Sequence, residues 1–228
     1  MLSVIIPVYN EAEGVSDLLT YLISELKGTD SEIVVVDGGS SDNTVEICQN
    51  LNINVFVCDR KGRASQMNFG AHKAKGDVYY FLHADSYPPK GFVKDILSEI
   101  ESGVGAGCYQ LAFSPNNRIL SFYAWFTRFN LNILRFGDQS LFTTRKVFDE
   151  VGGFDERLIV MEDQKIVRDI KRISSFSILD KKVVTSSRKY FQVGVVKLQL
   201  VFTLLLCLYY LGVRQSTLVK LYKNLVAA

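Results

Sequence analysis

The first 86 residues alternate short, continuous apolar runs with segments in which apolar residues recur at helical spacing. Continuous runs of this length are typical of strands that are buried on both faces. The four runs cover residues 2–7, 32–36, 55–57 and 78–82. This alternation predicts an α/β fold with a doubly wound, mostly parallel central sheet, helices on both faces and right-handed crossovers.

Local signals place the helices between these strands. Apolar residues follow helical spacing from Val15 to Leu26 and end at Gly28, which is typical of a helix stop. Asn10 and Glu13 stand three residues apart, which predicts a capping box at the start of this helix.

After Pro89 the pattern is looser, and the predicted elements are shorter. We expect a helix at 93–100, a strand at 105–113, an aromatic-rich and mainly helical segment at 120–134, a strand at 140–144, a turn at 151–155, a helix that begins near Glu162, two short strands near Ile178 and Val183, and two final helices at 193–211 and 216–226. These patterns predict an α/β domain over residues 1–190 and an appendage of apolar, basic helices over residues 191–228.

Composition adds two limits to this prediction. A chain of 228 residues with 48% hydrophobic and 22% charged residues is long and apolar enough to bury a sizeable core. Its four cysteines lack the spacing of zinc ligands, so we interpret them as apolar core residues in a reducing compartment. The first residues have a strand pattern rather than that of a signal peptide, and a cytoplasmic location is expected.

Charge is distributed unevenly along the chain. Residues 181–228 contain eight Lys or Arg and no Asp or Glu, whereas residues 1–180 contain 18 basic and 24 acidic residues. Within this basic tail, residues 198–213 are apolar except for Gln199 and Thr203, a run too short to span a bilayer. The run could be a core helix, a homodimer contact, or a helix that lies on the anionic cytoplasmic face of a membrane. No nucleic-acid partner is expected.

Three acidic residues stand at the ends of predicted elements. Asp85 follows the apolar strand 78–82, and ligands bind outside the carboxyl ends of strands in open parallel sheets. A carboxylate there suits a divalent cation that holds phosphates, although Asp85 could also simply open a turn. Asp37 follows another apolar strand and could face a ligand or cap a helix, whereas Asp163 stands near a helix start. Arg63, after Gly62, suits a phosphate or a base edge, or is a solvated loop charge.

The ordered motifs resemble those of family-2 glycosyltransferases with the GT-A fold. The matching segments are 4–11 (VIIPVYNE), 34–44 (VVVDGGSSDNT), 63–71, 74–77 (AKGD), 82–85 (LHAD), 152–156 (GGFDE) and 162–163 (ED). Residues 137–139 (GDQ) and the segment 209–213 are similar to a compact bacterial branch grouped with carotenoid and lipid glycosyltransferases.

This resemblance implies roles for the matched residues. The implied donor is a nucleoside-diphosphate sugar, and we expect a UDP-linked one. The implied acceptor is a hydroxyl group, and our hypothesis is that it is lipid-linked. Asp163 would be the general base, with inversion at the sugar carbon, and Asp85 would bind Mg²⁺ or Mn²⁺ on the diphosphate. The implied substrate-binding residues are Pro7, Tyr9 and Glu11 in the nucleotide pocket, Asp37 on the base, Arg63 near the base or phosphates, and His83, Ala84 and Glu162 around them.

The chain departs from the family pattern at one position. His83 stands where the family's DxD motif has its first Asp. This replacement removes one carboxylate, so we expect either a lower affinity for the metal or a different metal. Two other functions remain as alternatives. A sugar-nucleotide pyrophosphorylase would need a basic Gly-rich loop after the first strand, and residues 8–11 (VYNE) are not such a loop. A non-catalytic nucleotide-sugar-binding protein would be expected to lose Asp85 or Asp163, and both are present.

Overall fold

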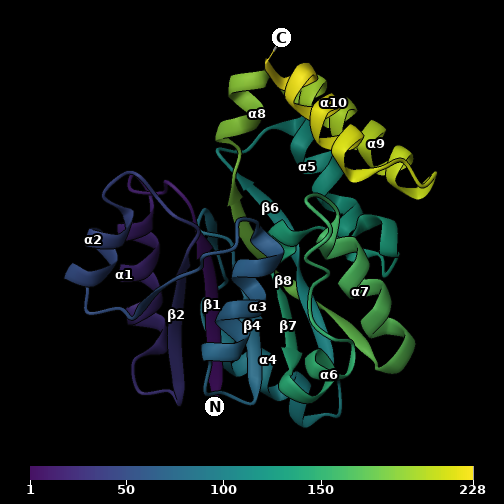
Figure 1. Ribbon diagram of the computed structural model, residues 1–228. Helices are drawn as coiled ribbons and strands as arrows, with labels where there is room; N and C mark the ends of the chain where they lie inside the picture. Colours follow the sequence, from purple (N-terminus) through teal and green to yellow (C-terminus); the bar gives the residue numbers. More distant parts are fainter. Residues whose placement is uncertain (228) are drawn as a thin grey trace.

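The computed structural model describes residues 1–227, which form one eight-stranded sheet with helices on both faces (Figure 1). The order across the sheet is β3-β2-β1-β4-β7-β6-β8-β5. The strands are β1 (Leu2–Val8), β2 (Ser31–Asp37), β3 (Val55–Val57), β4 (Val78–Phe81), β5 (Ser86–Tyr87), β6 (Ala106–Ser114), β7 (Leu141–Thr144) and β8 (Phe176–Ser186). The helices are α1 (Val15–Leu26), α2 (Thr44–Asn50), α3 (Arg63–Lys73), α4 (Phe92–Glu101), α5 (Arg118–Trp125), α6 (Arg145–Glu150), α7 (Glu162–Ile173), α8 (Arg188–Val193), α9 (Val195–Tyr210) and α10 (Gln215–Ala227).

The amino-terminal half has the predicted architecture. β1 pairs in parallel with β2 on one side and with β4 on the other, and β3 extends the sheet beyond β2. All four residues of β4 are buried, as the continuous apolar run predicts. The carboxyl ends of β1, β2 and β4 therefore lie at the same edge, and the segments that follow them carry most of the predicted site residues.

The other half of the sheet is mixed. β7 runs antiparallel to both β4 and β6, while β6 and β8 are parallel. The two short strands predicted near Ile178 and Val183 are one strand, β8, whose pairing with β6 shifts register at Tyr109/Gln110. A bulge of this kind interrupts the apolar pattern without ending the strand, which explains why the sequence suggests two pieces.

Alternating side chains of the strands form two cores, one on each face of the sheet. Val4 and Ile6 of β1 pack on the face that α1 and α4 cover, whereas Ile5 packs on the face that α3, α6 and α7 cover. α3 approaches the sheet closely at Gly70, where a Cβ atom would lie 2.5 Å from a methyl group of Ile5. The residue at this position must therefore be small.

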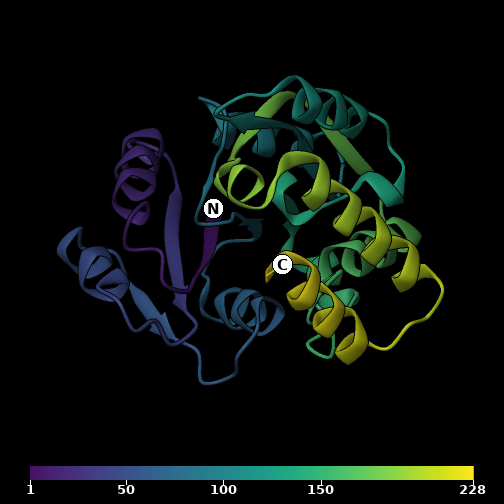
Figure 2. The same cartoon turned by 90° about the horizontal axis from the view of Figure 1, so that it is seen from above.

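The carboxyl-terminal helices lie over the end of the sheet at which β1, β2 and β4 finish (Figures 1 and 2). The helix predicted for 193–211 is α9, and the sequence analysis missed the short helix α8 before it, which Gly194, with a φ of 102°, separates from α9. One side of α9 is buried: Leu198 is fully covered, and Val201 and Leu205 form a small core with Leu218 of α10. The other side is exposed and apolar.

Two local predictions were wrong. Only residues 118–125 of the aromatic segment form an α-helix, and short 3-10 turns at 126–128 and 132–134 follow it. The predicted capping box does not form, because α1 begins only after Gly14 and the side chain of Asn10 instead accepts a hydrogen bond from the N–H of Ser41 at 2.8 Å.

Candidate functional site

Two loops at the carboxyl ends of β1 and β2 are joined by hydrogen bonds. In addition to the Asn10–Ser41 contact, the N–H of Glu11 donates to Thr44 Oγ1 at 2.9 Å, and the N–H of Ala12 donates to Asp42 Oδ2 at 3.1 Å. Tyr9 projects from this loop with 58% of its surface exposed, which leaves its ring available to a planar ligand. Pro7, the preceding predicted residue, is half-buried within β1.

Asp37 is buried at the end of β2, where it organises the following turn. Its Oδ2 accepts hydrogen bonds from the N–H groups of Gly39 at 2.9 Å and Ser40 at 3.0 Å, and its Oδ1 accepts one from the Ser40 hydroxyl. The Asp37 carboxylate therefore stabilises this turn, whether or not it also contacts a ligand.

A buried glutamine from α3 connects the same two strands. Gln66 Nε2 donates to the carbonyl oxygens of Val8 at 2.8 Å and Val36 at 2.9 Å, where β1 and β2 diverge. Gly38 packs directly on this amide, because a Cβ atom there would lie 3.0 Å from Gln66 Cδ. The sequence analysis did not identify Gln66, although a glutamine among the apolar positions of a predicted helix was an available signal.

β4 ends in the segment that carries His83, Ala84 and Asp85. His83 and Ala84 are buried and Asp85 is half-buried. His83 Nδ1 lies 3.0 Å from Asp138 Oδ1. Although burial opposes ionisation, the hydrogen bond from His83 holds the pKa of Asp138 below its ordinary value. The carboxylate accepts this hydrogen bond in the His83 tautomer that carries its proton on Nδ1.

Glu162 and Asp163 form the first turn of α7, and Met161 occupies the N-cap position before them. Arg63 Nη1 lies 3.5 Å from Glu162 Oε1; the Glu162 side chain is 5% exposed and that of Arg63 is 49% exposed. Asp163 lies against Gly137. A Cβ atom at Gly137 would collide with the Asp163 carboxyl group and lie 2.7 Å from His83 Cε1. Gly137 therefore allows His83 and Asp163 to approach each other.

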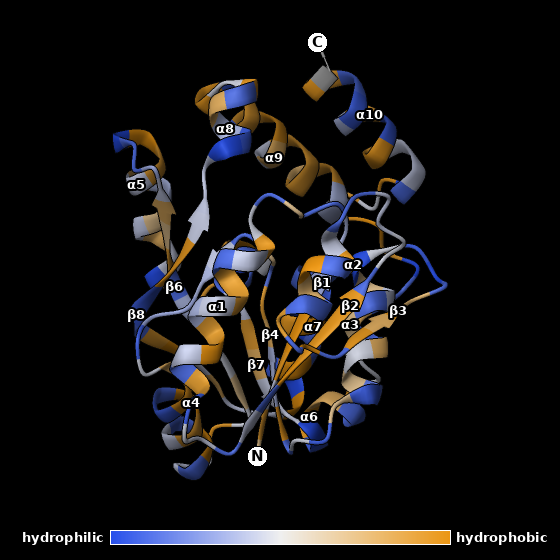
Figure 3. Ribbon diagram, turned by 90° about the vertical axis from the view of Figure 1, so that its left-hand side faces the viewer, coloured by the Kyte–Doolittle hydropathy of each residue, from blue (hydrophilic) through white to orange (hydrophobic). Residues whose placement is uncertain are grey.

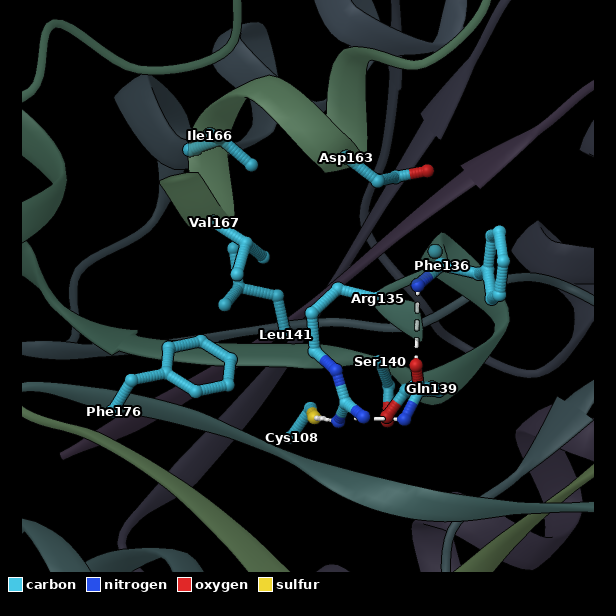
Figure 4. A pocket seen from close by; sticks show the side chains of 11 residues that line it. Cys108, Arg135, Phe136, Gln139, Ser140, Leu141, Asp163, Ile166, Val167 and Phe176 are labelled. Carbon is cyan, nitrogen blue, oxygen red and sulfur yellow. Dashed lines mark hydrogen bonds between the residues drawn. The ribbon is translucent and has the colours of Figure 1, made fainter. Parts of the chain in front are cut away.

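A small cavity adjoins Asp163 (Figure 4). Ile166 and Val167 line it from α7, and Arg135 and Phe136 line it from the segment before β7. Arg135 is 1% exposed and donates to the carbonyl oxygen of Phe129 at 2.7 Å, which fixes the aromatic segment beside the cavity. With a volume of about 20 Å³, the cavity has room for one water molecule.

Burial changes the protonation of the two α7 carboxyl groups. It raises the pKa of Glu162 to about 7, and the Asp163 charge adds to this rise while Arg63 opposes it. Burial also raises the pKa of Asp163, against the effect of His83 and Arg63. Because each charge raises the other's pKa, the two groups titrate as a pair. A carboxyl group whose pKa is raised in this way is a better general base at neutral pH than an exposed one.

The carboxylate oxygens of Asp85 are the candidate ligands for a divalent cation. Within residues 1–227, no three His, Cys, Asp or Glu side chains cluster as a complete metal site. Mg²⁺ is commonly held by one or two carboxylates together with substrate phosphates, so a complete protein cage is not required. Burial, and then the charge of Asp85, raise the pKa of Glu11. The residues present therefore fit a cation at Asp85, since it would relieve the repulsion between these two carboxylates.

The structure brings the predicted residues to one edge of the sheet in three groups. Glu11 and Asp85 lie within electrostatic reach of each other, Arg63 contacts Glu162, and Asp163 lies beside His83. Asp37 and Tyr9 lie farther along the same edge, on the loops after β2 and β1. Asp138 had entered the sequence analysis only as part of a motif, without a role.

An α/β sheet of this order, with carboxylates at its carboxyl edge, defines the GT-A class of glycosyltransferase folds. The family model for glycosyl transferase family 2 matches residues 3–154, and the chain belongs to this family. The predicted fold class and family are thereby confirmed.

Curated relatives cover part of the chain. A dolichol-phosphate mannosyltransferase of Pyrococcus furiosus is 36% identical over 106 residues, which is 44% of this chain and 30% of the relative. Glycosyltransferase AglE of Haloferax volcanii is 29% identical over 175 residues, which is 69% of this chain and 57% of the relative. The chain thus spans less than two thirds of the length of either protein.

Solved structures share the fold. Residues 1–349 of TarS from S. aureus superpose with a TM-score of 0.69 at 21% identity, covering 84% of this chain and 62% of that one. The mannosyltransferase PcManGT from Pyrobaculum calidifontis, solved with GDP-Man and Mn²⁺, gives a TM-score of 0.67 at 19% identity, covering 84% of this chain and 59% of that one.

We predict that Gly137→Ala lowers both stability and activity, because the added methyl group forces His83 and Asp163 apart. Overpacking of this kind costs roughly 1–3 kcal/mol, and urea unfolding measures it. Gly14→Ala is the matched control, since a Cβ atom there has no neighbour within 4 Å among the described residues. Equal stability of the two variants would contradict the close approach at Gly137.

Proposed function

We propose that the chain is an inverting glycosyltransferase that moves a sugar from a nucleoside-diphosphate sugar to a hydroxyl acceptor. The observation that carries the proposal is the position of Asp163, a half-buried carboxyl group with a raised pKa that lies close to His83 at the carboxyl edge of the sheet. Asp163 removes the proton from the acceptor hydroxyl as it attacks the sugar carbon. One base and a direct displacement produce inversion at that carbon.

The nucleotide is held by the loops after β1 and β2. Pro7, Tyr9 and Glu11 line its pocket, and Asp37 binds the base, for which uracil is the first candidate. Arg63 exchanges its contact with Glu162 for the base or the phosphates. The joined loops around Asn10 and the Asp37 turn support this assignment, because they hold the pocket in one shape before the ligand arrives.

Asp85 would hold Mg²⁺ or Mn²⁺, which neutralises charge on the departing diphosphate when it is bound. His83, fixed by Asp138, and Ala84 shape the wall between this position and Asp163. With a histidine in place of a second carboxylate, the chain offers the cation fewer charged ligands, so the diphosphate must supply more of its coordination.

The acceptor is proposed to be lipid-linked, and the protein to bind the cytoplasmic face of a membrane through the appendage formed by residues 191–228. Within the part of the chain that the structure describes, no helix is long and apolar enough to cross a bilayer. α9 is apolar along its length (Figure 3), and its exposed side carries Val196, Leu200, Leu204 and Leu211. The exposed rings of Phe122 and Trp125 lie on α5, which contacts α9.

The basic residues of the tail complement this apolar surface. Lys197 lies on the exposed side of α9, and Arg214, Lys220 and Lys223 are exposed at and within α10. Near an anionic membrane surface each such charge contributes about 1 kcal/mol. A membrane at this position would present a lipid-linked hydroxyl at the same end of the molecule as Asp163.

We predict that the protein sediments with vesicles that contain anionic lipid at low salt and that deletion of residues 193–228 abolishes this. A milder test is Leu200→Glu with Leu204→Glu on the exposed side of α9. Ile23→Glu, at an exposed apolar position of α1, is the matched control. Unchanged vesicle binding after either change would contradict attachment through α9. A homodimer that covers α9 would appear instead as a doubled mass in sedimentation without lipid.

We also predict a pH-dependent effect of Glu162→Gln. The folded pKa of Glu162 is about 7, above its ordinary value of 4.5, so its contribution to stability is fully present below pH 4.5 and is lost as the pH rises through 7. The wild-type protein should therefore lose more stability between pH 5 and pH 8 than Glu162→Gln does. We expect a difference on the order of 1 kcal/mol in urea unfolding, and parallel pH profiles would contradict the raised pKa.

A further inference from the structure

The segment after β8 brings a cation to the end of β4. The N–H of Ser186 donates to the backbone carbonyl of Asp85 at 3.1 Å, and the N–H of Arg188 donates to Ser186 Oγ at 3.2 Å. Arg188 thus follows, two residues later, the residue that is hydrogen-bonded to the backbone of Asp85, where the cation on the diphosphate is proposed to bind. It comes from a part of the chain to which neither the motifs nor the family match assigns a role.

Arg188 faces acidic side chains across a cleft. Glu11, Glu13 and Asp42 line this cleft together with Arg188. Arg188 Nη1 lies 3.1 Å from Glu13 Oε2, and this contact joins α8 to the loop after β1. Arg188 also acts on Glu11, whose pKa burial and Asp85 raise and Arg188 lowers. The guanidinium group therefore contacts the exposed Glu13 and lies within electrostatic reach of Glu11.

The contact with Glu13 is weak enough to be exchanged. The Glu13 side chain is 89% exposed and that of Arg188 is 55% exposed, and ion pairs between exposed side chains contribute little to stability. A diphosphate offers more negative charge than one carboxylate and matches the planar fork of a guanidinium with two parallel hydrogen bonds. A bound diphosphate would thus compete effectively with Glu13.

We propose that Arg188 binds the diphosphate of the donor and that Glu13 holds Arg188 near this position while the site is empty. This inference rests on the proposed function. Arg188 is the first residue of α8, which leads directly into α9 and α10.

The test compares two variants that break the same ion pair from its two sides. Binding of uridine, UMP and UDP, and of the guanosine series in parallel, is measured by isothermal titration with and without Mn²⁺. Arg188→Gln should weaken binding of the diphosphate at least fivefold and leave binding of the nucleoside unchanged. Glu13→Gln should strengthen binding of the diphosphate about two- to fivefold, because Arg188 loses its competing partner. Arg118→Gln, at an exposed position of α5, is the charge-matched control and should change nothing.

A contact that only fastens α8 to the loop gives a different result. Both variants would then weaken diphosphate binding to the same extent, or neither would change it, and either outcome overturns the inference. Thermal unfolding confirms that both variants fold. If the wild-type protein binds none of these ligands, the proposed function fails as well. If the wild-type protein binds the diphosphate and Arg188→Gln binds it equally well, only the role of Arg188 fails.

Discussion

Asp163→Asn should reduce turnover by roughly 10²- to 10⁴-fold while nucleotide binding stays intact, because that is the range that general base catalysis supplies. The asparagine keeps the size of the side chain but cannot take the acceptor's proton. The proposed role rests on the position of Asp163, in the first turn of α7, against Gly137 and close to His83.

The control for this variant is Asp169→Asn, on the same helix, where the carboxylate pairs with Lys165 at 2.6 Å. It should retain turnover. If Asp163→Asn works at nearly the wild-type rate, the base lies elsewhere, and Glu162 is the first alternative. A role of Asp163 as an N-cap would predict a stability loss of about 1 kcal/mol instead, but Met161 occupies that position.

The second large effect is expected at Asp85. Asp85→Ala should abolish the gain in diphosphate affinity that Mn²⁺ or Mg²⁺ produces, a loss that we expect to be at least tenfold, or about 1.4 kcal/mol. Nucleoside affinity should not change, because the proposed position of the base is at the loops after β1 and β2. Titration of UDP and uridine with and without the cation measures both quantities.

Asp77→Ala is the matched control, since Asp77 is an exposed carboxylate just before β4, at the opposite end of the strand from Asp85. It should leave the effect of the cation unchanged. Equal binding of UDP with and without Mn²⁺ in the wild-type protein, or an unchanged cation effect in Asp85→Ala, would contradict the metal role.

The parts of the fold that could be predicted from the sequence are those in which burial is local. β4 reads as an unbroken apolar run because both of its faces are covered, and Asp85 follows it directly. The bulge in β8 was missed because a register shift depends on the partner strand β6. The capping box at Asn10 failed because a loop 31 residues later offers this side chain a better partner, Ser41.

The contacts within the site were even harder to predict, because they join residues that are far apart in the sequence. Motif order located Asp163 and His83, but the contact of His83 with Asp138 spans 55 residues and depends on how the turn at Gly137 is placed. The ion pair between Arg188 and Glu13 spans 175 residues and joins two loops that neither composition nor periodicity connects. Such contacts form only when the whole fold is assembled, and no local sequence pattern predicts them.

The most direct test of the account is the release of nucleoside diphosphate from a panel of UDP- and GDP-sugars by the wild-type protein and by Asp163→Asn, with Mn²⁺ or Mg²⁺ present. The account predicts that at least one donor is turned over by the wild-type protein and that Asp163→Asn binds this donor but releases its nucleotide at least 100-fold more slowly. Equal release rates for the two proteins would contradict catalysis by Asp163, and tight binding of a donor without release by either protein would indicate a nucleotide-sugar-binding protein instead.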